Sequence, residues 1–189
     1  MKRVFIIHGW TTTNQQDWIP WAVKETTKKG YTVIAPLMPD TNYPMIEAWV
    51  QKMAEVVGVV QPTDIFIGHS LGCQAILRYL ETQPEHTKFD KLILVAGAQH
   101  LSREALPLPE DEGIFAPWRN TPINFEKIRK MAKKVVALFS NDDPWVLFED
   151  NAPIYKEKLG AEIILLNNKG HFMETNGGVT KLPEILQYL

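Results

Sequence analysis

Short runs of apolar residues, many of them β-branched, recur along the chain and are separated by more polar segments. Six of these runs have the length of strands, and they span residues 4–7, 32–35, 65–67, 92–96, 135–139 and 163–166. Continuous apolar runs, in contrast to alternating ones, are typical of strands that are buried on both faces of a sheet. The pattern therefore predicts six buried strands.

The segments between these strands carry the spacing of amphipathic helices. Apolar positions repeat at helical intervals between residues 46 and 57, and segments 17–29 and 73–80 also read as helices. Regular alternation of strands and helices favours parallel strands joined by right-handed crossovers. We predict an α/β fold: a three-layer αβα sandwich around an open six-stranded parallel sheet, with residues 1–189 forming a single domain.

One connection is longer than the others, and it joins the fourth strand to the fifth. It contains several prolines, the acidic stretch 110–112 and the apolar pair Ile114 and Phe115. We predict a short cap-like connection around residues 98–123, in which residues 101–118 form a loop that partly covers a pocket. A surface loop without a catalytic role is an equally good interpretation of this segment.

Composition and charge narrow the classes of partner. The chain has 189 residues and a formal charge of −2, so no long-range attraction to nucleic acid or to an anionic membrane is expected. The basic residues between 127 and 134 have the spacing of a solvated helix face. No apolar stretch is long enough for a membrane span or for the core of a signal peptide. A single cysteine, Cys73, excludes an intrachain disulfide and favours a reducing compartment, so we expect a cytoplasmic protein.

A candidate nucleophile follows the third predicted strand. Ser70 is the centre of the pentapeptide Gly68-His69-Ser70-Leu71-Gly72, which comes directly after the apolar run 65–67 and directly before a helical segment. A nucleophile elbow needs this strand-turn-helix context, and it needs small residues on both sides because its backbone is strained. The context makes Ser70 the predicted nucleophile.

Two further residues complete a Ser-His-Asp arrangement in the order that this fold class uses. The fifth strand is followed by Asp142 and Asp143, of which we select Asp143, and the sixth is followed by His171. Because the carboxyl ends of parallel strands meet at one edge of the sheet, we expect these groups to converge on Ser70. His171 would act as the base, and the carboxylate would orient it.

The remaining site predictions concern the oxyanion and the substrate. The backbone N–H groups of Leu71 and Trp10 are the expected oxyanion donors, with His8 shaping the loop that carries Trp10. We expect Phe115, Trp118 and Trp145 to line the substrate pocket, and His69 and Cys73 to be packing residues. The five histidines lack metal-ligand spacing, and no glycine-rich phosphate loop follows the first strand. We therefore predict no metal and no cofactor.

Several motifs together resemble the alpha/beta-hydrolase superfamily and, within it, the small serine hydrolases related to retinoblastoma-binding protein 9. The similarity covers nearly the whole chain, and its motifs lie at residues 8–10, 18–21, 38–40, 68–72, 142–144 and 170–172. The resemblance implies a reduced hydrolase core and a triad of Ser70, Asp143 and His171, and it favours Asp143 over Asp142 because the aspartate before the proline is the family's triad member. The retinoblastoma-binding segment is absent, since residues 71–75 lack its acidic residue.

The sequence thus predicts a serine hydrolase that cleaves a small or medium carboxylic ester through an acyl-enzyme, with a small acyl compound as its partner. Thioester or amide cleavage and acyl transfer would use the same residues, so these alternatives stay open. A non-catalytic interaction scaffold on a hydrolase core is the other alternative.

Overall fold

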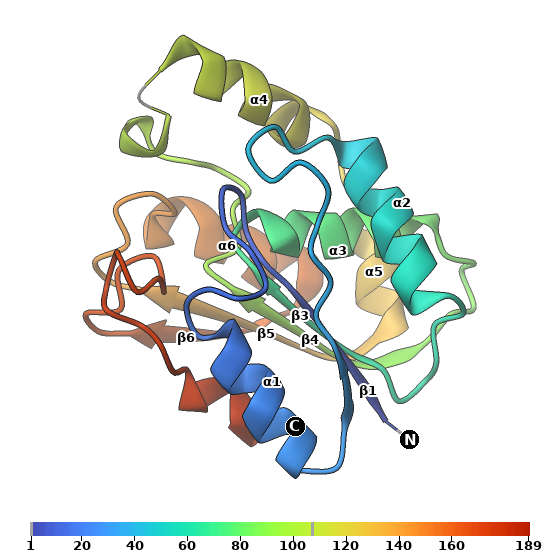
Figure 1. Cartoon of the computed structure of the whole chain (residues 1–189). Helices are drawn as coiled ribbons and strands as arrows, with labels where there is room; N and C mark the ends of the chain where they lie inside the picture. The colour runs from blue at the N-terminus through green and yellow to red at the C-terminus, as the bar shows by residue number, and fades with distance from the viewer. Residues whose placement is uncertain (1, 107) are drawn as a thin grey trace.

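The computed structural model describes residues 2–106 and 108–189. It has an α/β fold, in which helices pack on a central sheet (Figure 1). The sheet has six strands in the order β2-β1-β3-β4-β5-β6, and all neighbouring pairs are parallel. The strands are β1 (Arg3–Ile7), β2 (Thr32–Ile34), β3 (Ile65–His69), β4 (Phe89–Val95), β5 (Ala132–Ser140) and β6 (Glu162–Leu166). The predicted fold class is confirmed, and the predicted strands differ from the observed ones mainly at their ends.

Helices cover both faces of this sheet. Strand residues alternate between two apolar clusters: Phe5 and Phe66 belong to the cluster on one face, whereas Ile6 and Ile67 belong to the other. This alternation follows from the period of two along a strand. One face is covered by α2 (Ile46–Val57), α3 (Leu71–Thr82), α5 (Phe125–Met131) and α6 (Phe148–Leu159), and the other by α1 (Ile19–Lys28) and the C-terminal 3-10 helix η2 (Pro183–Tyr188).

The connection from β4 to β5 differs from its prediction. A loop was expected over residues 101–118, but the structure has a 3-10 helix, η1 (Arg103–Ala105), and the helix α4 (Pro109–Asn120). Pro109 occupies the first turn of α4, where its missing N–H costs nothing, and acidic residues 110–112 complement the positive end of the helix. Pro109 and the acids that suggested a loop thus mark the start of a helix, and Pro117 lies within it.

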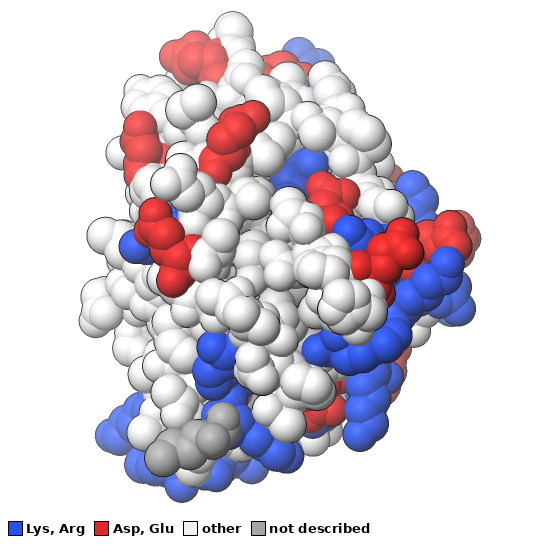
Figure 2. Space-filling view, turned by 90° about the vertical axis from the view of Figure 1, so that its right-hand side faces the viewer, with Lys and Arg blue, Asp and Glu red and all other residues white. Residues whose placement is uncertain are grey.

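The basic residues between 127 and 134 also lie on different elements from those expected. Lys127, Arg129 and Lys130 lie on α5, but Lys133 and Lys134 already belong to β5. In Figure 2 acidic side chains lie mainly in the upper part of the face shown and basic ones mainly along its lower edge and right side, with uncharged residues between them. Within the described residues no helix is both long and apolar enough to cross a bilayer.

The strand order places a switch point between β1 and β3. The chain leaves β1 toward β2 on one side and later enters β3 on the other side of β1. In open α/β sheets the crevice beyond the carboxyl ends of such strands is where ligands bind. The loop after β1 and the turn after β3, which carries Ser70, therefore face each other at the position where a site is expected.

Gly72 allows α3 to approach the end of β1. A Cβ at residue 72 would lie against the backbone carbonyl oxygens of Ile7 and His8, closer than real Cβ atoms come to other groups. Both obstacles are backbone atoms of a buried strand end, so neither can move aside cheaply. The first turn of α3 can therefore reach the sheet only with glycine at this position.

We expect Gly72→Ala to lower the free energy of unfolding by about 3 kcal/mol, because the added methyl group overpacks a buried backbone contact. Gly113→Ala is the matched control: Gly113 lies within α4 and a Cβ there would meet nothing within 4 Å. Alanine at residue 113 should stabilise by about 0.5–1 kcal/mol through helix propensity. Urea unfolding of both variants tests this contrast, and equal effects would refute it.

Candidate active site

Ser70 occupies a strained turn between β3 and α3. Its φ and ψ are 51° and −120°, a conformation that is unfavourable for a residue with a side chain. Its N–H donates to the carbonyl of Val95 at 2.9 Å, and its own carbonyl accepts the N–H of Cys73 at 3.1 Å. A Cβ at Gly68 would lie 2.7 Å from the Cα of Cys73, so glycine is required on this side of the elbow as well.

His171 and Asp143 form a buried hydrogen-bonded pair. Nδ1 of His171 lies 2.8 Å from Oδ2 of Asp143, and both side chains are at most 5% exposed. The other carboxylate oxygen of Asp143 accepts the backbone N–H groups of Trp145 and Val146 at 2.9 and 3.0 Å. The carboxylate is thus fixed by three contacts, and with Nδ1 held by Asp143, Nε2 is the ring nitrogen that remains for another partner.

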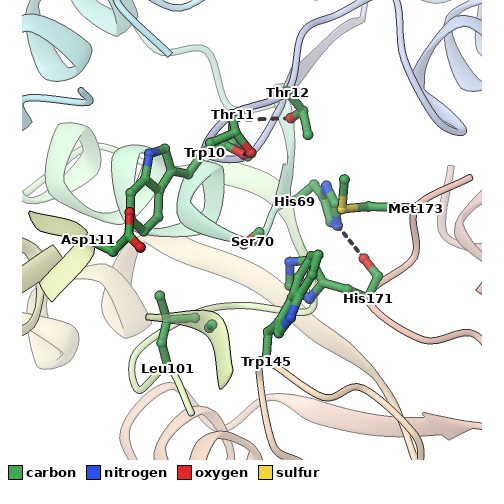
Figure 3. A pocket seen from close by; sticks show the side chains of 12 residues that line it. Trp10, Thr11, Thr12, His69, Ser70, Leu101, Asp111, Trp145, His171 and Met173 are labelled. Carbon is green, nitrogen blue, oxygen red and sulfur yellow. Dashed lines mark hydrogen bonds between the residues drawn. The ribbon is translucent and has the colours of Figure 1, made fainter. Parts of the chain in front are cut away.

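Ser70 and His171 line the same cavity, which has a volume of about 230 Å³ (Figure 3). Its walls come from five parts of the chain. The loop after β1 contributes residues 9–12, the elbow contributes His69 and Ser70, the β4–β5 connection contributes Leu101, Ala105 and Asp111, and the loops after β5 and β6 contribute Trp145, His171 and Met173. The proposed nucleophile and an imidazole therefore open into one partly apolar pocket.

Two of the three aromatic residues predicted to line this pocket do not reach it. Trp145 lines the cavity and lies beside His171, with ring centroids 4.9 Å apart. Phe115 and Trp118, in contrast, are buried in the core on the inner side of α4, where Trp118 Nε1 donates to the carbonyl of Pro44. The ring of Trp118 contacts Trp49 of α2 and Arg78 of α3, which anchors α4 to the helical layer on this face of the sheet.

The proposed oxyanion donors lie next to the elbow. Leu71 is the first residue of α3, where a backbone N–H has no partner within the helix. Among the described residues, none accepts the N–H of Trp10. Gly9 keeps the two segments close, since a Cβ at residue 9 would lie 3.0 Å from the Cβ of Ser70. The two proposed donors thus lie on segments that adjoin Ser70.

His8 holds the loop that carries Trp10. Its Nε2 accepts the N–H of Met38 at 2.9 Å, and its Nδ1 lies 2.9 Å from the carbonyl of Gly9. The first bond makes Nε2 the unprotonated nitrogen and leaves the proton on Nδ1 for Gly9. Burial lowers the pKa of His8 and keeps this ring neutral. The expectation that His8 shapes this loop agrees with these contacts.

His69 connects the elbow to the loop of His171. Its Nε2 lies 2.8 Å from the carbonyl oxygen of His171, so this nitrogen carries the proton. Burial, with a smaller contribution from the charge of His171, lowers the pKa of His69 to about 3. The ring also packs against Trp18. His69 is therefore a neutral packing and positioning residue that borders the pocket.

Residues around His171 hold its loop in place, a role that the sequence analysis did not assign to any residue. Asp142 accepts the backbone N–H of Gly170 at 2.9 Å and the hydroxyl of Ser140 at 2.6 Å, and the latter bond is the main cause of its lowered pKa. Asn176 accepts the N–H of His171 at 2.8 Å. The two adjacent aspartates thus have different tasks, since Asp143 contacts the ring of His171 and Asp142 fixes the backbone before it.

Cys73 does not line this cavity. Cys73 is fully buried beneath the elbow, and burial raises the pKa of its thiol. The remainder of segment 71–75 is buried in α3 as well. Across residues 2–106 and 108–189, no group of three or more His, Cys, Asp or Glu side chains is placed to hold a metal ion.

The fold and the elbow define an alpha/beta hydrolase, and comparisons with known proteins give the family. The model of the serine hydrolase family matches residues 4–189, so the chain belongs to this family. It is 28% identical to YdeN of Bacillus subtilis, a protein named as a hydrolase, over all of this chain and 94% of that protein. It is 26% identical to the rat protein Serine hydrolase RBBP9, over 89% of this chain and 80% of that one.

Solved structures agree with this assignment. The crystal structure of the B. subtilis ydeN product superposes with a TM-score of 0.87 at 27% identity, covering all of this chain and 98% of that chain. Est1E from Butyrivibrio proteoclasticus superposes with a TM-score of 0.70 at 18% identity, over 98% of this chain and 83% of that chain, and so shares the fold. The family and the structures together support hydrolytic activity.

Substitutions can distinguish the roles of the two adjacent aspartates. We expect Asp143→Asn to lower kcat for an activated ester by about 10⁴, because the asparagine amide would favour the wrong tautomer of His171. Asp142→Asn should cost at most about tenfold, since it weakens two bonds to the loop and leaves the contact with the ring intact. Steady-state kinetics of both variants tests this order, and a larger loss for Asp142→Asn would reverse the assignment.

The low pKa of His69 predicts acid sensitivity. An unfolded histidine has a pKa near 6.5, so between about pH 3 and 6.5 the unfolded state binds a proton that the folded state excludes. Stability should therefore fall as the pH drops below 6.5, by about 2 kcal/mol per such histidine at pH 5. Urea unfolding at several pH values should show a flatter profile for His69→Gln. The exposed His86→Gln is the control, and a slope unchanged by His69→Gln would contradict the prediction.

Proposed function

We propose that this protein hydrolyses small or medium carboxylic esters through an acyl-enzyme on Ser70. The observation that carries the proposal is the buried bond from His171 to Asp143 at the edge of a cavity that Ser70 also lines. A serine hydroxyl needs a base to become a nucleophile at neutral pH, and an oriented imidazole beside it is that base.

The proposed reaction has two steps. Ser70 Oγ attacks the ester carbonyl while Nε2 of His171 takes its proton, and the imidazolium is stabilised by Asp143. Negative charge forms on the substrate oxygen and is met by the N–H groups of Leu71 and Trp10. His171 then returns the proton to the leaving alcohol. A water molecule, deprotonated by the same histidine, releases the acid and restores Ser70.

The size of the site favours a small substrate. The cavity of about 230 Å³ lies below the range of about 300–1,000 Å³ that is usual for drug-sized ligands. Leu101, Ala105 and Asp111 come from the β4–β5 connection, so we propose that this connection acts as a short cap on the pocket. We also propose a cytoplasmic location, on the basis of the single buried cysteine.

Labelling with a fluorophosphonate probe tests this function. We expect the wild type to be modified at one residue, Ser70, because the activated hydroxyl attacks the phosphorus and displaces fluoride. Ser70→Ala should give no adduct, and peptide mass spectrometry locates the site. Cys73→Ser is a matched control that removes the buried thiol three residues away and should label like the wild type.

Turnover decides between ester cleavage and its alternatives. Short-chain p-nitrophenyl esters should be hydrolysed faster than the matching thioesters and anilides. A folded wild type that neither labels nor turns over would leave the scaffold interpretation in its place. Faster turnover of thioesters or amides would change the substrate class while keeping the residues.

A further inference from the structure

The catalytic pocket carries an unbalanced negative charge. Among the described residues that line it, Asp111 is the only carboxylate, and the lining contains neither lysine nor arginine. The other titratable groups there are His69, which burial keeps neutral, and His171. A substrate that enters this pocket therefore meets one acid and no fixed cation.

One carboxylate oxygen of Asp111 has no hydrogen-bond partner among the described residues. Its Oδ2 accepts the backbone N–H of Leu108 at 3.1 Å, which caps the first turn of α4. Its Oδ1 accepts no hydrogen bond from any residue in the described ranges, and no salt bridge to a described residue engages the carboxylate. Glu112 on the same turn, in contrast, pairs with Arg119. Helix capping thus accounts for only one of the two oxygens of Asp111.

Aromatic faces border the same space. Figure 3 shows the carboxylate of Asp111 directed toward the indole of Trp10, across the pocket from Trp145 and His171. The indole of Trp10 is held in place, because its Nε1 donates to the carbonyl of Asn42 at 3.0 Å. A carboxylate beside an indole face attracts a cation through both charge and the ring quadrupole, and it repels an anion.

We propose that Asp111 sets the charge specificity of the site, so that the enzyme prefers esters bearing an ammonium or guanidinium group and rejects esters bearing a carboxylate or phosphate. This proposal rests on the proposed ester hydrolysis for its catalytic consequence. The recognition itself depends only on the pocket and can be measured without turnover.

Two series of isosteric esters test the proposal by kinetics. One series has p-nitrophenyl esters whose acyl chains end in trimethylammonium, tert-butyl or carboxylate. The other compares the acetate esters of choline and of 3,3-dimethylbutanol, which places the charge on the leaving group. In at least one series we expect kcat/KM for the cationic ester to exceed that of its neutral isostere by about tenfold at low salt, with the carboxylate ester the slowest.

Substitutions connect this preference to one side chain. In Asp111→Asn the amide oxygen can still accept the N–H of Leu108, so the cap of α4 is kept while the charge is lost. The cationic preference should fall to about one in this variant. Glu110→Gln removes an equal charge from the neighbouring exposed residue and should keep the preference. A preference that survives in Asp111→Asn, or a wild type that prefers neutral or anionic esters in both series, would overturn the proposal.

Binding to Ser70→Ala separates this proposal from the catalytic one. By isothermal titration, the non-hydrolysing variant should bind a cationic ester about tenfold more tightly than its isostere, and Ser70→Ala/Asp111→Asn should lose that difference. If this holds while the wild type hydrolyses nothing, charge recognition stands and ester hydrolysis fails. If neutral esters are hydrolysed but neither turnover nor binding depends on charge, ester hydrolysis stands and the role of Asp111 fails.

Discussion

The contact between the first turn of α3 and the end of β1 is the constraint on which the site depends. Gly72 allows α3 to lie against the carbonyls of Ile7 and His8, and Gly9 allows the loop after β1 to lie against Ser70. The buried sheet and α3 hold this approach in place, so the positive φ of Ser70 is maintained by packing on both sides. The proposed nucleophile and the two proposed N–H donors are therefore held by the same close backbone contact.

The loop that carries His171 has anchors of its own in addition to its bond to the elbow. Asp142, Asn176 and Asp17 bind the backbone at residues 170, 171 and 174, while Asp143 binds the ring itself. The bond from His69 to the carbonyl of His171 then ties this loop to the turn after β3. Different residues thus fix the two partners of the proposed proton transfer, and His69 connects the two networks.

The sequence was sufficient to predict the features that depend on local patterns of residues. Continuous apolar runs identified all six strands, because buried parallel strands have no polar face, and the glycines around Ser70 identified the elbow. The positions of Ser70, Asp143 and His171 beyond three strand ends follow from parallel topology, which the alternating pattern predicted. Trp145, two residues after Asp143, lines the cavity as well.

The features that were missed depend on the orientation of α4. Prolines and acids at a helix start resemble those of a loop, so residues 101–118 were interpreted without a helix, and Phe115 and Trp118 were assigned to the pocket instead of the core. Once α4 is present, its helical period turns these rings inward and leaves Asp111 at the pocket wall. The acidic stretch was a visible signal, but only the tertiary position of the helix shows which of its three carboxylates faces the site.

A crystal structure of the fluorophosphonate adduct would test the central claim most directly. The account predicts a covalent bond from Ser70 Oγ to phosphorus, with the phosphoryl oxygen about 2.7–3.1 Å from the N–H groups of both Leu71 and Trp10. A phosphoryl oxygen that pointed to solvent, or an adduct on another residue, would contradict the claim that the packing of α3 against β1 builds the reactive centre.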